Sequence, residues 1–271
     1  MRRLAAAVFA LTCIAAFAAG SGAAAPAPPP VGAPGGLVVA LDLGDASLQA
    51  GVVRGGAVLL ARGFEVEVAK ALARRLGSGR ARFVEMRPAV RLLAGAPAGW
   101  QLALASIEPT RAARAAADLS VPYLTTDVAV VLRRGAPRPR GIGDLRGLVL
   151  CAGKGSEAVR VLRGTVRPRR TPLVASDDDR LRTLLRTGAC DAGLVPAVEA
   201  GRFVHGHGGE LGAVTGRIRE GDGLVVAVAR GAGLDVAAVD RALRRLRADG
   251  TLGRLARSWL GLDPARLRVL R

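Results

Sequence analysis

The sequence predicts an α/β fold built on mainly parallel sheets. Two observations predict it: short apolar runs of strand length recur along the chain, and segments with helical periodicity separate them. The runs are LVVAL at 37, RFVEM at 82, LALA at 102, VAVVL at 128, LVLCA at 148, PLVA at 172, GLV at 193 and LVVAVA at 224. Half of the 271 residues are hydrophobic, which excludes a chain that is disordered throughout.

The clearest predicted helix is GFEVEVAKALARRLG, which begins at Gly63. Phe64, Val68 and Leu72 recur on one face, acidic residues stand in the first turn and arginines in the last. Gly77 can adopt the left-handed conformation that ends a helix.

A pair of helices is predicted at the C-terminus. Asp235 caps the first and Gly250 stops it, while Thr251 opens the second and Gly261 closes it. The acidic run SDDDR at 176 predicts a further helix N-terminus, because the helix dipole favours acidic groups there.

The N-terminus has the pattern of a secretion signal over residues 1–25: a short basic segment, an apolar segment and small residues suited to cleavage. Residues 26–36, rich in Ala, Pro and Gly, predict a linker. We therefore expect an exported protein of the periplasm or of the outer face of the membrane. A lipid anchor on Cys13 is disfavoured, because Thr12 and Ala10 fit poorly before a lipidated cysteine.

The net charge of +18 comes almost wholly from arginine, since Lys70 and Lys154 are the only lysines. The arginines are spread over most predicted elements, and aromatic residues make up only 3% of the chain. A nucleic-acid binder would concentrate them on one element among aromatics, so no nucleic-acid partner is expected. Most arginines should be solvated, and a minority are candidates to line a pocket for an anion.

The cysteines beyond the signal are Cys151 and Cys190. An even number in an oxidising compartment predicts one disulfide, and two buried free thiols are the alternative. His205 and His207 near Glu210 resemble a metal trio, but paired histidines in a Gly-rich loop are more often solvated, so no metal is expected. The chain carries no phosphate-cradling or dinucleotide motif, and no cofactor is expected.

Four stretches in order carry a resemblance to a known family: GFEVEVAKALARRLG, DLSVPYLTTDVAVVLRRG, IGDLRGLVLCAGKGS and RALRRLRADGTLGRLARSWLG. From about residue 37 to 262 the chain resembles the extracellular solute-binding proteins of family 3, the polar amino-acid-binding components of ABC transporters.

The resemblance implies a two-lobed periplasmic-binding-protein fold of type II, with a doubly wound, mainly parallel sheet in each lobe and two hinge strands between them. VAVVL and LVVAVA match those hinge strands. Lobe 1 is then expected over 37–130 and 227–271, and lobe 2 over 131–226. A ligand that bridges the lobes favours the closed state, which a membrane permease recognises.

The resemblance also implies ligand contacts, and the expected set is Asp42, Ser106, Arg111, Arg114, Ser156 and Glu157. The family's carboxylate-binding arginine falls on Ala113 here, so the flanking Arg111 and Arg114 are the candidates. Ser156 starts a predicted helix in lobe 2. Cys151 and Cys190 fall on strands that the doubly wound order places side by side.

Besides Ala113, two further family positions depart from the pattern. The ammonium-binding aspartate is replaced by Pro196, and the aspartate that precedes LALA by Gln101. A solute that is anionic but not zwitterionic, or an empty cleft, therefore fits as well as an ordinary amino acid.

The expected function is capture of a small, carboxylate-bearing solute for an ABC transporter by a monomer, without catalysis. The alternatives are an envelope sensor or scaffold with a degenerate cleft, and an enzyme like the cyclohexadienyl dehydratase that uses the same fold. In that enzyme reading Glu157 is the one acid placed in the cleft.

Overall fold

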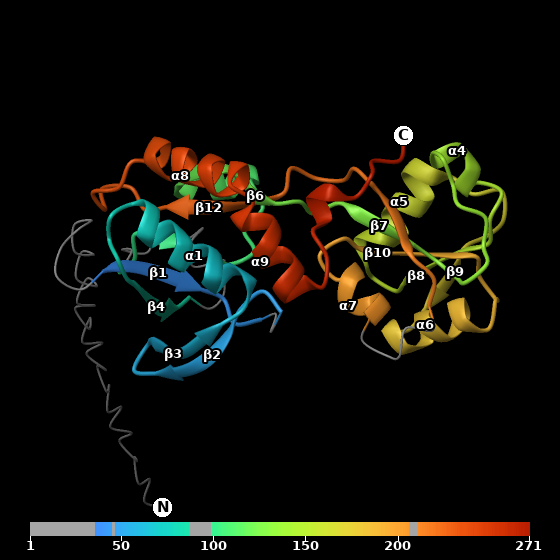
Figure 1. Ribbon diagram of the computed structural model, residues 1–271, viewed down its shortest axis with the longest axis horizontal. Helices are drawn as coiled ribbons and strands as arrows, with labels where there is room; N and C mark the ends of the chain where they lie inside the picture. Colours follow the sequence, from blue (N-terminus) through green and yellow to red (C-terminus); the bar gives the residue numbers. More distant parts are fainter. Residues whose placement is uncertain (1–35, 45–46, 87–98, 206–210) are drawn as a thin grey trace, which may run out of the picture.

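The computed structural model describes residues 36–44, 47–86, 99–205 and 211–271. These residues form two α/β lobes, each built around its own sheet, which lie side by side along the long axis of the molecule (Figure 1). We name the part on the seven-stranded sheet lobe 1 and the part on the five-stranded sheet lobe 2. The predicted signal, residues 1–25, lies outside the described residues, as does all of the linker except Gly36.

The sheet of lobe 1 has the strand order β2-β3-β4-β1-β5-β12-β6. β1 pairs in parallel with β4 and β5, whereas β12 runs antiparallel to β5 and β6. The strands are β1 (Leu37–Leu41), β2 (Ala50–Arg54), β3 (Ala57–Arg62), β4 (Ala81–Glu85), β5 (Leu102–Ala103), β6 (Asp118–Leu124) and β12 (Leu224–Val228). The helices are α1 (Phe64–Arg75), α3 (Arg111–Ala116), α8 (Val236–Ala248) and α9 (Thr251–Leu260).

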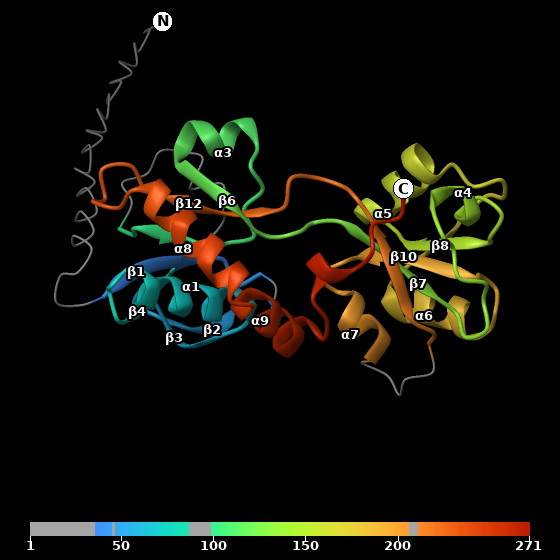
Figure 2. The ribbon, with the colours of Figure 1, turned by 45° about the horizontal axis from the view of Figure 1, so that its top comes forward.

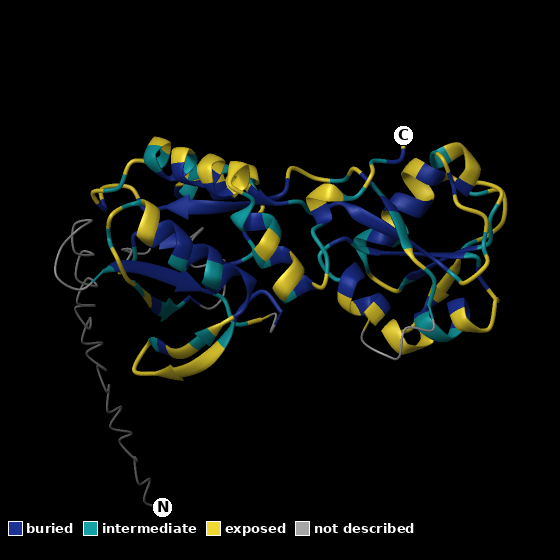
Figure 3. Cartoon of the chain, viewed as in Figure 1, coloured by how far each residue is buried: buried dark blue, intermediate teal, exposed yellow. Residues whose placement is uncertain are grey.

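Both faces of this sheet are covered, which is why the run LVVAL is buried along its whole length. One face packs on α1, α8 and α9, and Figure 3 shows the buried strands under helices whose outer sides are exposed. The other face packs on α3 through Ala113 and Ala117. α1 begins and ends as its sequence predicts, and Asp235 caps α8 by accepting a hydrogen bond from the backbone N–H of Ala237 at 3.0 Å.

The sheet of lobe 2 has the order β11-β7-β10-β8-β9, with β8 parallel to β10 and β9 and with β7 antiparallel to its neighbours. Helices lie on both of its faces. The strands are β7 (Val128–Leu132), β8 (Leu150–Gly153), β9 (Leu173–Ala175), β10 (Ala192–Pro196) and β11 (Val214–Ile218). The helices are α4 (Ile142–Leu145), α5 (Glu157–Val161), the π-helical turn η1 (Leu162–Val166), α6 (Asp178–Arg186) and α7 (Ala200–His205), and a 3₁₀ turn, η2 (Pro264–Arg266), follows α9.

The predicted hinge strands need a correction. VAVVL lies wholly within the sheet of lobe 2 as β7, and LVVAVA begins within that of lobe 1 as β12, because both runs are apolar enough to be buried in a sheet. The segments that cross between the lobes are the polar ones beside them, residues 125–127 and 219–223, which connect β6 to β7 and β11 to β12.

The two crossings are joined at the lobe 2 end. Asp127 is 3% exposed, forms an ion pair with Arg217 and accepts a hydrogen bond from the backbone N–H of Glu220 at 3.0 Å. Arg217 also donates to the carbonyl oxygen of Leu267 at 3.1 Å. A buried carboxylate with this pairing fixes the point from which both crossings leave lobe 2.

The C-terminal residues also depart from the prediction, which assigned everything from 227 to 271 to lobe 1. After α9 the chain runs back along lobe 2, as Figure 2 shows in red. Val269 bridges to Arg217, the backbone N–H of Ile142 donates to the carbonyl oxygen of Arg271 at 3.0 Å, and Leu270 is buried in the lobe 2 core. We refer to residues 262–271 as the C-terminal tail. It is a third connection between the lobes.

A glycine pair brings the lobes into close contact. α7 of lobe 2 approaches the end of α9 so closely that a methyl group on Gly201 would overlap the carbonyl oxygen of Leu260 and lie 2.8 Å from the carbonyl carbon of Gly261. Gly261 has φ 78°, the left-handed conformation that ends α9 and turns the tail toward lobe 2.

Candidate functional site

The lobe 1 half of the candidate site lies at the carboxyl ends of β1 and β5, which are adjacent and parallel. Asp42 directly follows β1, and Ser106 follows β5 by three residues. Both side chains are partly exposed. The backbone N–H of Asp42 donates to the side-chain oxygen of Gln49 at 3.0 Å, which fixes the loop after β1. The carboxyl ends of parallel strands are where ligands bind in open α/β sheets.

A buried carboxylate holds the loop after β5. Glu65, in the first turn of α1, is fully buried and accepts hydrogen bonds from the backbone N–H of Ser106 at 3.0 Å and from its hydroxyl at 3.2 Å. The Tyr123 hydroxyl donates to the same oxygen. Burial, and secondarily the Glu65 carboxylate, raises the pKa of Tyr123 well above its usual value, which keeps this hydroxyl a donor.

Ser106 has φ 52°, a left-handed conformation that is uncommon for a residue other than glycine. The Glu65 carboxylate therefore stabilises a strained backbone at the edge of the candidate site. The sequence marked Glu65 only as an acid favoured by the helix dipole. Its burial could not be read from the periodicity, because an acidic residue in a first turn is normally solvated.

Helix α3 determines which arginine can serve the site. The Thr110 hydroxyl caps α3 by accepting from the backbone N–H of Ala113 at 3.1 Å, and Ala113 itself is 3% exposed. Arg111 and Arg114 are both exposed. Arg230 donates to the carbonyl oxygen of Arg114 at 2.9 Å at the end of α3 far from β7 and the crossings. Arg111 is thus closer to lobe 2, by about 4.5 Å along the helix axis.

The lobe 2 half lies at the carboxyl ends of β8 and β10. Ser156 and Glu157 line a depression of about 310 Å³ there, together with Pro196. The Ser156 hydroxyl donates to the carbonyl oxygen of Gly153 at 2.7 Å, so it stabilises its own turn and does not cap α5. The charged residues that line this depression are Lys154, Glu157, Asp177, Asp178 and Glu199. Four acids against one lysine make it acidic.

Arg160 connects this depression of lobe 2 to the second crossing. It forms an ion pair with Glu157, one turn earlier in α5, and contacts Glu220 of the second crossing at 3.0 Å. The hydrogen bond with Glu157, and then the charges of Glu157, Glu220 and Glu108, raise the pKa of Arg160. The ion pair with Glu220 therefore ties helix α5 of lobe 2 to the second crossing.

Glu220 experiences opposing effects. Burial raises its pKa, the positive charge of Arg160 opposes this rise, and the adjacent Glu157 carboxyl adds to it. In the part of the chain that the structure describes, no hydrogen bond joins Asp42, Ser106, Arg111 or Arg114 to Ser156 or Glu157. The six expected contacts thus form two groups, one on each lobe.

The two positions that depart from the family pattern have structural roles. Gln101 is fully buried and its side-chain oxygen accepts the backbone N–H of Val38 at 3.0 Å, so it ties β5 to β1. Pro196 ends β10 with its carbonyl oxygen accepting from the backbone N–H of Glu199 at 3.0 Å. Neither residue presents a carboxylate to the cleft.

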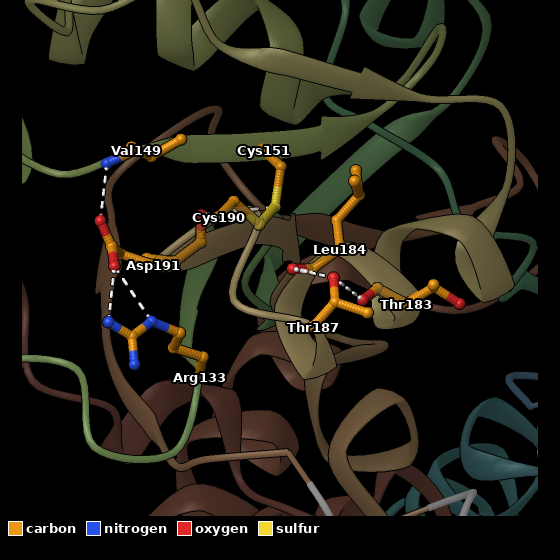
Figure 4. Close-up of a disulfide and its surroundings, with 9 residues drawn as sticks. Arg133, Val149, Cys151, Thr183, Leu184, Thr187, Cys190 and Asp191 are labelled. Carbon is orange, nitrogen blue, oxygen red and sulfur yellow. Dashed lines mark hydrogen bonds and ion pairs between the residues drawn. A yellow bond between two sulfur atoms is a disulfide. The ribbon is translucent and has the colours of Figure 1, made fainter.

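The predicted disulfide is present. Cys151 and Cys190 are bonded with their Cα atoms 6.1 Å apart, and both are fully buried (Figure 4). Asp191, the residue after Cys190, adds further contacts beside the disulfide. Its carboxylate accepts hydrogen bonds from the backbone N–H of Val149 and from the guanidinium of Arg133, both at 3.0 Å. Cys190 precedes β10, so the bond lies toward the amino ends of the strands and away from the candidate site.

The described residues contain no group of three or more His, Cys, Asp or Glu side chains placed to hold a metal ion. His205 is exposed at the end of α7, while His207 and Glu210 lie outside those residues. Among the helices described, none combines the length and the apolar character needed to cross a membrane.

Solved structures of the same fold are numerous. A polar amino acid ABC uptake transporter substrate binding protein from Streptococcus thermophilus is similar with a TM-score of 0.67 and 15% identity, covering 84% of this chain and 86% of that one. The L-cystine solute receptor of Neisseria gonorrhoeae, in its unliganded open conformation, gives 0.66 and 20%, covering 84% and 93%. An ancestral cyclohexadienyl dehydratase also gives 0.66 and 20%, covering 83% and 92%. At these identities the similarity establishes the fold alone.

No curated protein sequence matches this chain. The model of the bacterial extracellular solute-binding proteins, family 3, matches residues 60–262, which is most of the chain and includes parts of both lobes and both crossings. The match agrees with the two-lobed α/β architecture. This chain belongs to the family 3 bacterial extracellular solute-binding proteins.

Proposed function

We propose that this protein is exported and captures a small amino-acid-like solute between its lobes for an ABC transporter, with closure of the lobes as the signal to the permease. Membership of the family supports binding and transport. The observation that carries the proposal is that the expected contacts lie on both lobes at the carboxyl ends of parallel strands, with Asp42 and Ser106 on lobe 1 and the depression at Ser156 and Glu157 on lobe 2. A ligand that touches both would favour the closed state.

The charges on the two sides favour a solute with both a carboxylate and a cationic group. Lobe 1 presents the exposed guanidinium of Arg111, which matches carboxylate geometry. Lobe 2 presents the acidic depression around Pro196. The proline removes the family's ammonium contact, but Glu157 lies beside it and supplies a carboxylate from another element. This proposal replaces the solely anionic solute that the sequence left open.

The enzyme alternative has less support from the geometry. Glu157 is the candidate general acid, yet its side chain is 36% exposed and ion-paired with Arg160. A general acid that works near neutral pH is normally enclosed and shielded from such a cation.

A thermal-shift screen tests the proposal. The panel contains zwitterionic amino acids, diamines, dicarboxylates and cyclohexadienyl acids. A true ligand at 100 times its dissociation constant should stabilise the protein by about 2.7 kcal/mol. We expect a zwitterion to give the largest shift.

Matched variants then locate the site by calorimetric titration. Arg111→Gln should weaken binding by about tenfold or more, because a charge-assisted hydrogen bond is lost. Arg114→Gln, one turn farther from lobe 2, should change it less than about threefold. If no compound in the panel shifts the protein, a scaffold or sensory role with a degenerate cleft is the better explanation. Turnover of a cyclohexadienyl acid would establish the enzyme instead.

A further inference from the structure

A second large pocket lies outside the candidate site. It has a volume of about 760 Å³ and is bounded by the end of β6, the second crossing, the start of α9 and the C-terminal tail. None of the six expected solute contacts lines it. Its walls therefore combine segments from both lobes with all three connections between them.

The pocket is strongly basic. Its charged lining residues are six arginines and three aspartates: Arg217, Arg219, Arg247, Arg254, Arg257, Arg266, Asp127, Asp222 and Asp263. The rest of the lining is Thr125, glycines and seven apolar or aromatic residues, among them Phe64, Tyr123 and Leu252. A pocket of this size and composition fits an anion better than an apolar ligand.

Several of these guanidinium groups are fixed in position. Arg254 donates to the carbonyl oxygen of Asp249 at 3.0 Å and to the hydroxyl of Thr251 at 2.9 Å. Arg247 donates to the carbonyl oxygen of Pro122. Because carbonyl and hydroxyl oxygens carry no charge, these contacts orient the arginines without neutralising them.

The aspartates neutralise only part of the charge. Asp127 pairs with Arg217, and Asp263 lies 3.9 Å from Arg257. Burial, and then the neighbouring charge of Arg219, lowers the pKa of Arg217, a sign that like charges are crowded here. Within the described residues, the side chains of Arg219 and Arg266 make no hydrogen bond or ion pair, although one lies on the crossing and the other on the tail.

We propose that this pocket is a second binding site, separate from the solute cleft, for a small multivalent oxyanion of the phosphate type. Arg219 and Arg266 provide the unpaired charges, and Arg247 and Arg254 provide oriented donors on the facing helices. Several guanidinium groups around one concave site match the geometry of an oxyanion with two or more charges. A bound anion also relieves the repulsion among the arginines.

The test is calorimetric titration of the whole protein with inorganic pyrophosphate at low ionic strength, without any transport solute. We expect saturable binding with a stoichiometry of one. The double variant Arg219→Gln with Arg266→Gln should bind at least about tenfold more weakly. Its circular dichroism spectrum and melting temperature should match those of the parent, because neither side chain has a partner in the described structure.

The control is Arg74→Gln with Arg170→Gln, which removes the same charge from exposed positions outside the pocket. It should bind pyrophosphate as the parent does. Equal weakening in both double variants would show diffuse attraction to a basic protein and would overturn the proposal, as would an absence of saturable binding. Because the titration uses no solute, its result is independent of the function proposed for the cleft.

Discussion

The two lobes reach a similar architecture by different means. Lobe 1 has the sheet with more strands, and three of its helices pack together on one face and form an extensive core with it. This lobe also contains a fully buried carboxylate, that of Glu65. Lobe 2 has the smaller sheet, and each of its two apolar cores is smaller than the largest core of lobe 1. It adds a disulfide and the ion pair of Asp191 with Arg133. The difference follows from size, because a smaller unit buries a smaller share of its surface and depends more on cross-links.

The chain allows this comparison to be measured, because both tryptophans, Trp100 and Trp259, lie in lobe 1. Tryptophan fluorescence therefore follows the unfolding of lobe 1, while far-ultraviolet circular dichroism follows both lobes.

Replacing both Cys151 and Cys190 by Ala should have the largest effect. The disulfide closes a loop with a sequence separation of 39 residues, which the chain-entropy model credits with about 4 kcal/mol. In denaturant titrations the circular dichroism transition should move to lower denaturant while the fluorescence transition stays nearly in place. Reduction of the parent protein should reproduce the change. Equal shifts of both signals would mean that the lobes unfold as one unit.

Glu65→Leu should destabilise lobe 1 and leave lobe 2 nearly unchanged. It leaves the Tyr123 hydroxyl and the backbone N–H of Ser106 without their acceptor, and we expect a loss of about 3 kcal/mol in the fluorescence transition. The matched control is Glu67→Leu in the same helix turn, which removes only a partly exposed pair with Lys70 and should cost less than about 1 kcal/mol. Equal costs would show that the buried network contributes nothing specific.

Gly201→Ala should affect the contact between the lobes. The added methyl group overlaps the end of α9, and such overpacking costs about 2 kcal/mol. Because the contact joins α7 to α9, both transitions should shift. Gly143→Ala in α4 is the control, since nothing lies within 4 Å of the new methyl group, and it should be neutral or slightly stabilising. A stable Gly201→Ala protein would show that α7 and α9 are free to separate.

The smallest effect concerns pH. The pKa of Glu220 is raised in the folded state, chiefly by burial, so the folded protein binds more protons than the unfolded one above the usual pKa of a glutamate. Its contribution to stability is therefore present at low pH and is lost as pH rises through the folded pKa. Stability of the parent minus that of Glu220→Gln should fall with rising pH in this window. A stability difference that stays constant or rises with pH would contradict a raised pKa of Glu220 in the folded protein.

Much of the fold could be predicted from local pattern. The apolar runs at 37, 128 and 224 begin β1, β7 and β12 at the predicted residues. Asp235 caps α8 as predicted, and α9 begins at Thr251 and ends before Gly261. SDDDR starts α6, with Asp177 accepting from the backbone N–H of Arg180 at 2.8 Å. These features depend on neighbours within about one helical turn or one strand, which the sequence displays directly.

The candidate site was only partly predictable. The family resemblance indicated six contacts, and the structure divides them between two lobes: Asp42, Ser106, Arg111 and Arg114 on lobe 1, and Ser156 and Glu157 on lobe 2. In the structure, the direction of α3 places Arg111 nearer to lobe 2 than Arg114. The spacing of residues along the sequence does not predict this direction. Arg160 and Glu220 were missed, because they come together only through the second crossing, 60 residues beyond α5.

The α/β class, the family resemblance and the main helices could be predicted from the residues alone, because local periodicity and motif order encode them, and the disulfide was predicted beside an alternative of two free thiols. Only the tertiary structure decided that Glu65 is buried beneath the β5 loop, that the C-terminal tail returns to lobe 2 and that six arginines line one pocket. Each of these depends on contacts between residues far apart in the chain. Charge and hydrophobicity at a position do not specify such contacts, because the same arginine is equally compatible with open solvent and with a pocket wall.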